Sequence, residues 1–185
     1  MDVNENAKNE GAAISERELR GFVNAGLSYV DRYGGPRARV ERALFRRARQ
    51  RELTLEAAAR VVAAAMAKID GFGVVDDRAF AESKARGLRS RGASRRAALA
   101  KLQATGIAPD LAEAALAAAD DASADDADGG ERLAAERYAR RRRLGPWRTD
   151  PAVRAERRDR DVAALARAGF PPGLAIAVID GQDEP

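Results

Sequence analysis

The stretch Gly71-Phe-Gly-Val-Val-Asp-Asp-Arg-Ala-Phe-Ala81 contains the signals that end one helix and begin the next. The preceding run, residues 55–70, is rich in Ala and Val and carries apolar residues at helical spacing. Gly71 suits the left-handed conformation that terminates many helices. Asp76 or Asp77 can cap the following helix by accepting hydrogen bonds from its unpaired backbone N–H groups. The stretch therefore predicts a capped junction between two helices.

The composition favours helices and excludes several classes of site. The 185 residues are rich in Ala, Arg and Leu, only 5% are aromatic, and no segment alternates apolar and polar residues over the length of a strand. We therefore expect an all-α protein. The absence of Cys and His excludes disulfides, imidazole-activated nucleophiles and zinc sites built from these residues. No Gly-x4-Gly-Lys-Ser/Thr loop occurs, and we expect no enzymatic activity, no metal and no cofactor.

The hydropathy pattern gives no sign of membrane insertion or export. The longest apolar run, around residues 55–69, is interrupted by charged residues and is too short to span a bilayer. The first residues, Met-Asp-Val-Asn-Glu-Asn, are polar and lack a signal-peptide pattern. We therefore expect a cytoplasmic protein that does not bind membranes.

The basic residues are concentrated in three blocks. The net charge is +4, yet residues 32–60, 78–101 and 132–160 carry +6, +7 and +7, which leaves −16 on the remainder. Such blocks present a positive surface to a polyanion or to an acidic protein surface. Solvated arginine faces without a partner are the alternative, and the similar placement of the three blocks favours binding.

One segment in the middle of the chain is repeated near its end. The residues Leu102-Gln-Ala-Thr-Gly-Ile-Ala-Pro-Asp-Leu-Ala-Glu-Ala-Ala-Leu116 align with Leu165-Ala-Arg-Ala-Gly-Phe-Pro-Pro-Gly-Leu-Ala-Ile-Ala-Val-Ile179 at a constant interval of 63 residues. The matches fall on a helix-ending Gly, a helix-starting Pro and apolar positions, which are the residues that a helix–turn–helix corner needs. Upstream, Gly92 and Gly145 are separated by 53 residues, so the later copy contains a ten-residue insertion around 146–155.

These signals predict three modules of three helices. The expected divisions are a disordered tail at 1–14, modules at 15–75, 76–117 and 132–181, and a flexible acidic linker at 118–131. The linker has five aspartates but lacks the spacing of a calcium-binding loop. Trp147 in the insertion is interpreted as a local packing anchor, with stacking on a base as the alternative.

The ordered set of motifs resembles the RecX family of recombination regulators over about residues 20–181. The similar features are the junction at 71–81, Arg86-x-x-Arg89-x-Arg-Gly92, Leu102-x3-Gly-Ile107, and Leu165-Ala-Arg-Ala-Gly-Phe170 followed by Leu174 and Val178-Ile179. The first module departs from the pattern. Gly35-Pro-Arg-Ala-Arg-Val40 stands where the family has a Ser-x-x-Glu-Leu helix start.

The resemblance implies an elongated, curved array of three tandem three-helix bundles with helix–turn–helix-like repeats. Members of the family bind the RecA recombinase in the helical groove of its DNA filament, and they inhibit filament growth, ATP hydrolysis and strand exchange. The resemblance therefore implies a monomeric negative regulator of homologous recombination and DNA repair. Weak, non-specific binding to single- or double-stranded DNA is also expected.

The candidate partner-binding residues lie mainly in the second and third basic blocks. They are Arg86, Arg89, Arg91, Arg95, Arg96, Lys101, Arg140, Arg141, Arg142 and Arg143, with Asp76 and Asp77. Guanidinium groups pair bidentately with carboxylates and with phosphates, so these residues do not distinguish protein from DNA as the partner. For the two aspartates, helix capping is the favoured interpretation.

A DNA-binding protein with helix–turn–helix-like modules, transcriptional or architectural, is the alternative function. Such a protein reads base edges with polar side chains of a recognition helix. The third helices expected at 109–119 and 172–180 are almost free of such side chains. The sequence therefore argues against base readout.

Overall fold

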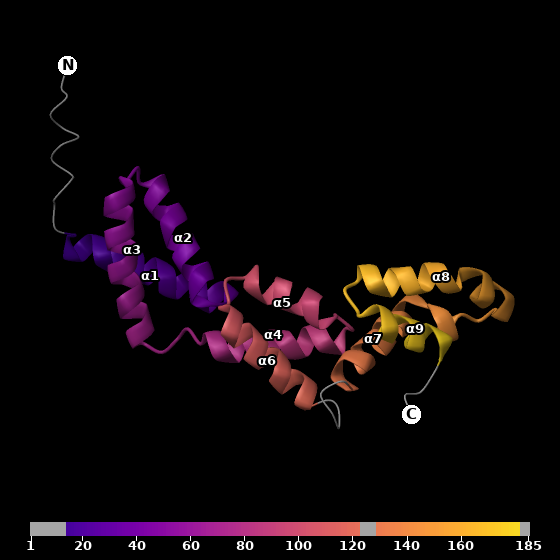
Figure 1. Cartoon of the computed structure of the whole chain (residues 1–185). Helices are drawn as coiled ribbons and strands as arrows, with labels where there is room; N and C mark the ends of the chain where they lie inside the picture. Colours follow the sequence, from indigo (N-terminus) through magenta and orange to yellow (C-terminus); the bar gives the residue numbers. More distant parts are fainter. Residues whose placement is uncertain (1–13, 123–128, 182–185) are drawn as a thin grey trace, which may run out of the picture. The chain divides into compact units, whose positions relative to one another are not determined.

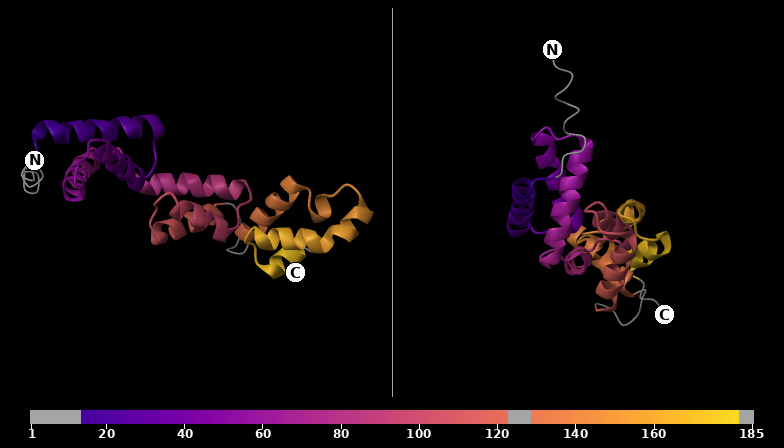
Figure 2. Two further views of the ribbon diagram at one scale, coloured as in Figure 1. Left: turned by 90° about the horizontal axis from the view of Figure 1, so that it is seen from above. Right: turned by 90° about the vertical axis from the view of Figure 1, so that its left-hand side faces the viewer.

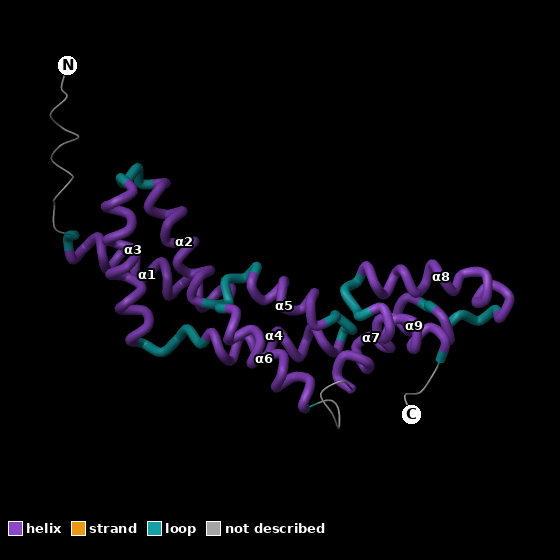
Figure 3. Tube along the Cα trace, viewed as in Figure 1, coloured by secondary structure: helices purple, strands orange, loops and turns teal. Residues whose placement is uncertain are grey.

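The computed structural model describes residues 14–122 and 129–181, which contain nine α-helices, one short 3₁₀ helix and no strand (Figures 1 and 3). The prediction of an all-α fold built from tandem three-helix bundles is therefore confirmed. The chain divides into two compact units, Met1–Asp77 and Arg78–Pro185. Within the described ranges, the first unit contains one hydrophobic core and the second contains two. None of the described helices is long and apolar enough to cross a membrane.

The first bundle comprises α1 (Glu16–Tyr33), α2 (Arg37–Gln50) and α3 (Leu55–Gly71). Figure 2 shows α1, in indigo, lying against the other two helices. Two helix starts follow from the sequence, because Ser15 Oγ accepts a hydrogen bond from Glu18 N at 3.2 Å and Thr54 Oγ1 accepts one from Ala57 N at 3.3 Å. The helices pack closely, since a Cβ atom at Gly26 would lie 2.3 Å from Ile69 Cδ1.

The expected tail, residues 1–14, lies outside the described residues except for Ile14. Ile14 is half-buried and packs against the first hydrophobic core. This last residue of the expected tail therefore belongs to the first bundle.

The junction at 71–81 differs in detail from the expectation. Gly71 is the last residue of α3, and the left-handed residue is Gly73, with φ +63°. Asp77 Oδ1 accepts a hydrogen bond from Arg37 N at 2.6 Å. This aspartate therefore caps the start of α2. It supplies the acceptor that α2 lacks, because Pro36 precedes the helix and provides no side-chain cap.

The second and third bundles form the second unit and repeat the same corner. Their helices are α4 (Asp77–Ser90), α5 (Arg95–Gln103) and α6 (Pro109–Asp121), followed by α7 (Gly129–Arg142), α8 (Pro151–Arg167) and α9 (Pro172–Asp180). The equivalent residues Leu102 and Leu165 are both fully buried. Gly106 and Gly169 have φ values of +97° and +101°, a conformation that glycine adopts at little cost. The repeat register predicted from the sequence is therefore present.

The insertion in the third bundle forms a compact element. Residues Gly145–Trp147 make the 3₁₀ helix η2, and Trp147 packs against the third core. The interpretation of Trp147 as an anchor is thereby confirmed. Arg148 then pairs with the buried Asp161 on α8, through Nε–Oδ2 and Nη2–Oδ1 distances of 2.7 Å. Asp150 caps α8 by accepting a hydrogen bond from Ala152 N at 2.8 Å.

The expected linker at 118–131 has boundaries that are too wide. Helix α6 continues to Asp121, and α7 begins at Gly129. Residues 123–128 lie outside the described residues. The two helical ends of the expected linker carry Asp120 and Glu131, whose carboxylates pair with arginines of the second bundle.

Candidate anion-binding interface

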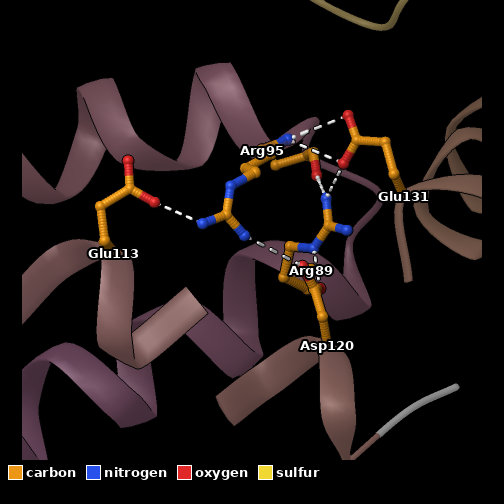
Figure 4. Close-up of polar contacts among 6 residues, drawn as sticks. Arg89, Arg95, Glu113, Asp120 and Glu131 are labelled. Carbon is orange, nitrogen blue, oxygen red and sulfur yellow. Dashed lines mark hydrogen bonds and ion pairs between the residues drawn. The ribbon is translucent and has the colours of Figure 1, made fainter. Parts of the chain in front are cut away.

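Arg89 is a buried structural residue and not a surface residue, which corrects its assignment as a partner contact. Its side chain is 2% exposed. Nε lies 2.6 Å from Asp120 Oδ1 and Nη1 lies 2.6 Å from Glu131 Oε2, while Nη1 also donates to Ala93 O at 2.8 Å (Figure 4). Burying a guanidinium group costs free energy, and this cost is offset when carboxylates and carbonyls pair with it as they do here.

One sequence signal marked Arg89 as an inward residue. Ala81, Ala85 and Arg89 recur every four residues and so share one face of α4, and both alanines are fully buried. The pairing with Asp120 and Glu131 carried no comparable signal. These acids lie 31 and 42 residues away along the chain.

Arg95 is also largely committed to contacts inside the unit. Its backbone N–H donates to both carboxylate oxygens of Glu131, at 3.1 and 3.0 Å, so Glu131 contributes to the cap of α5. The side chain of Arg95 forms an ion pair with Glu113 and lies 3.7 Å from Asp120 (Figure 4). Arg95 is therefore neutralised in the free protein and is a weaker candidate for partner binding.

The second and third bundles are joined by close backbone packing beside this network. Ser94 caps α5 by accepting a hydrogen bond from Ala97 N at 3.2 Å, and its hydroxyl donates to Ala168 O at 2.7 Å. Gly92, with φ +71°, lies against α7, and a Cβ atom there would come within 2.5 Å of Tyr138 N. The turn between α4 and α5 is thus held against the third bundle.

A cavity of about 400 Å³ opens at this joint, and its charged lining is entirely basic. The cations are Arg91 and Lys101 from the second bundle and Arg141 and Arg142 from α7. Arg141 Nη1 donates to Arg91 O, which connects the two sides. No carboxylate of the described residues lines the cavity.

Tyr138 lines the cavity, and its ring contacts the guanidinium groups of two of the cations. The guanidinium carbons of Arg141 and Arg142 lie 5.7 and 5.2 Å from the centre of its ring. Such cation–π contacts hold arginine side chains in place without neutralising their charge. The cavity therefore keeps an unbalanced positive charge within a small volume.

This arrangement favours an anionic group. Like charges held close together raise the local potential, and a phosphate or carboxylate entering the cavity gains charge-assisted hydrogen bonds from several donors. Because the donors come from both bundles, an anion bound here contacts both of them.

The other candidates lie outside the cavity. Arg86 has 60% of its side chain exposed and is 3.9 Å from Glu82. Arg96, Arg140 and Arg143 are exposed. Asp76 is exposed, and Asp77 caps α2. The structure thus brings four of the predicted cations together, although the sequence did not single them out from the rest.

The described residues contain no cluster of three or more acidic side chains that could hold a metal ion. The charged groups that line the cavity are cations, which favours an anionic ligand over a metal ion.

Comparisons with known proteins are consistent with the repeat and the bundles. A family model described as RecX, second three-helix domain, matches residues 76–116, which comprise α4 to α6 apart from the end of α6. The chain is 39% identical over 164 residues to the regulatory protein RecX of Myxococcus xanthus (strain DK1622), and the match covers 86% of this chain and 84% of that protein. No solved structure matches the chain. The extent and identity of the match show that the chain belongs to the RecX family of regulatory proteins.

Proposed function

We propose that this protein is a negative regulator of homologous recombination and DNA repair. It acts as a cytoplasmic monomer that binds the RecA–DNA filament in its helical groove and inhibits RecA ATPase activity, filament extension and strand exchange. Membership of a family of regulatory proteins supports the proposal. The observation that carries it is the cavity lined by Arg91, Lys101, Arg141 and Arg142 without a carboxylate.

The cavity suits the chemistry of a nucleoprotein filament. DNA presents phosphates and a recombinase presents carboxylates, and the cations of this site pair with either group. Electrostatic attraction between the cations of the cavity and the polyanionic filament raises the rate at which the two molecules associate. This attraction weakens as salt is added. Inhibition then follows from occupancy, because a ligand that binds one filament state more tightly than others shifts the filament towards that state.

A non-enzymatic DNA-binding protein with helix–turn–helix-like modules is the second candidate. Helices α6 and α9 hold the position of recognition helices, and neither contains Arg, Lys, Asn, Gln, Ser or Thr. Binding to DNA in this protein therefore rests on phosphate contacts. Such binding is not sequence-specific and depends steeply on salt.

The test is the ATPase rate of preformed filaments of RecA on single-stranded DNA, titrated with this protein at physiological salt with and without excess competitor duplex. We expect inhibition at less than one protein per recombinase protomer, and we expect it to survive the competitor. Inhibition that disappears with competitor DNA would show that the protein sequesters DNA, which favours the second candidate.

A further inference from the structure

The first bundle carries a second basic surface that the proposed function does not use. A groove of about 490 Å³ lies between α2 and the start of α3. It is lined by Arg42, Phe45, Arg46, Arg49, Leu53, Leu55 and Ala58. We call these residues the α2–α3 groove.

The groove combines positive charge with exposed apolar side chains. Leu55, the first residue of α3, is 82% exposed, and Phe45 is 38% exposed. Thr54 caps α3 and Leu53 packs on the first core, so Leu55 has no evident part in holding the bundle together. Exposed leucine and phenylalanine side chains beside each other are typical of a surface that binds a partner.

The charges of the groove are unfavourable for the isolated helix. Arg42, Arg46 and Arg49 follow one another at intervals of four and three residues on α2, where like charges repel. Arg46 and Arg49 form no ion pair with any residue in the described part of the chain. Arg46 and Arg49 thus place two cations beside exposed apolar side chains, a combination that suits carboxylates supplied by another molecule.

We propose that the α2–α3 groove binds a short acidic amphipathic segment of a partner protein. Apolar side chains of the segment pack on Phe45 and Leu55, and its Asp or Glu side chains pair with Arg46 and Arg49. The volume of the groove suits a few anchoring side chains, as in other complexes where a helical segment lies in a groove.

A protein segment fits this groove better than a nucleic acid does. A nucleic acid supplies phosphates for the arginines, and Phe45 offers one ring on which a base can stack. It has no apolar group that covers Leu53 and Leu55, whose aliphatic side chains gain most from burial against other apolar side chains. The mixture of aliphatic and cationic groups therefore favours a peptide with both apolar and acidic residues.

The test measures the binding of synthetic, fluorescently labelled 16-residue peptides to the full chain by anisotropy. The probes carry Leu and Phe at spacings of three or four residues among Asp and Glu. Matched peptides have Ser in place of Leu and Phe, and a single-stranded 16-nucleotide DNA serves as the other ligand. We expect at least one amphipathic probe to bind at least about tenfold more tightly than its Ser-substituted match, because its Leu and Phe side chains are buried against apolar side chains of the groove.

Variants of the chain locate the binding. Leu55→Ser removes a side chain that is already in water, so it leaves the fold intact and is expected to weaken peptide binding at least about fivefold. Arg46→Glu with Arg49→Glu is expected to abolish it. The matched controls are Tyr33→Ser, an aromatic residue exposed elsewhere on the bundle, and Arg17→Glu with Arg20→Glu on α1.

Three outcomes would overturn the proposal. They are the absence of binding by every amphipathic probe, equal binding of the Ser-substituted peptides, and equal losses in the control variants. A fourth outcome, tighter binding of the DNA that is abolished by the Arg46 and Arg49 reversals, would also overturn the proposal and would assign the groove to nucleic acid. None of these outcomes depends on whether the protein inhibits RecA.

Discussion

Arg89 lies in a basic block, and its role is structural. Its side chain is 2% exposed, and its guanidinium group contacts Asp120 on α6 and Glu131 on α7. Arg89 therefore links α4 to both of these helices. Removing one member of a buried ion network leaves uncompensated charge in the interior, which costs more than the loss of an exposed pair. Charge reversal at Arg89 would therefore test folding and not partner binding.

Replacing Arg89 with Met is expected to destabilise the second unit by about 3–5 kcal/mol, because Asp120 and Glu131 lose their buried partner. Urea unfolding followed by circular dichroism measures the effect. The matched control is Arg86→Met on the same helix, which is exposed and should change the unfolding free energy by less than about 1 kcal/mol. Similar losses for both variants would contradict the assigned role.

The ionised side chain of Asp161 makes the stability of the third bundle depend on pH. The hydrogen bonds from Arg148, and to a lesser extent the one from the Gly145 N–H, hold the pKa of Asp161 below its ordinary value, although burial acts in the opposite direction. A carboxyl group whose pKa is lower in the folded state contributes stability that is complete above its unfolded pKa, about 3.9, and is lost as the pH falls through the folded value.

Asp161→Asn is expected to destabilise the third bundle by about 2–3 kcal/mol at pH 7, because the charged hydrogen bonds with Arg148 are lost. As the pH falls below the unfolded pKa of about 3.9, the difference from the wild type should shrink. Unfolding free energies measured between pH 7 and pH 3 give both results. The control Asp159→Asn changes a carboxyl group on the same helix that is in solvent, and an equal pH-dependent loss in this variant would exclude the assigned role of Asp161.

At the scale of helices, the caps show how distant residues replace a missing local signal. Helix α2 begins after Pro36 and has no acceptor of its own, and Asp77 supplies one from 40 residues away. Arg37 also pairs with Asp70 on α3 at 3.2 Å. The start of α2 is therefore tied to the end of α3 and to the junction at 71–81.

Asp77→Ala is expected to destabilise the first bundle by about 1 kcal/mol through loss of the α2 cap. Hydrogen exchange at the Arg37 amide provides the specific readout, since this N–H loses its acceptor and should exchange faster. Asp150→Ala, which removes the cap of α8, serves as the cross-control. Asp77→Ala should accelerate exchange only at the start of α2, and Asp150→Ala only at the start of α8. Acceleration at both starts in either variant would indicate general loosening.

The helices and the repeat could be predicted because their signals are local. Ser15, Thr54 and Ser94 mark helix starts through their own side chains, and Gly106 and Gly169 mark equivalent corners by their backbone conformation. Gly71 was a less reliable signal, because Gly73 lies two residues further and adopts the left-handed conformation instead.

The candidate site could be predicted only in part. Arginine is compatible with both solvent and buried ion pairs, so the basic blocks did not separate Arg89 and Arg95 from the cations of the cavity. That separation depends on packing between α4, α6 and α7, which joins residues 31 to 50 positions apart. The acids at the two ends of the expected linker were assigned to a flexible segment because their partners could not be recognised from spacing.

At the scale of the molecule, the cavity belongs to neither bundle alone. Lys101 comes from α5 and Arg142 from α7, and close packing at Gly92 and Ser94 holds their helices together. A site made by two bundles binds tightly only when both keep their relative position. The affinity for the filament that we propose would therefore depend on the stability of the second unit.

Charge reversals compared in the ATPase assay test whether the cavity cations bind the filament. Lys101→Glu with Arg142→Glu changes two exposed cations from opposite bundles, and neither is part of the Arg89 network. The control, Arg20→Glu with Arg160→Glu, makes the same change in net charge at exposed positions elsewhere. Each lost charge-assisted hydrogen bond is worth about 1.5–3 kcal/mol.

We therefore expect the cavity variant to need at least about tenfold more protein for half-inhibition of RecA, while the control stays within about twofold of the wild type. Circular dichroism and urea unfolding verify that both variants are folded. Unchanged inhibition by the cavity variant, or equal losses in the two variants, would exclude the cavity as the filament-binding site.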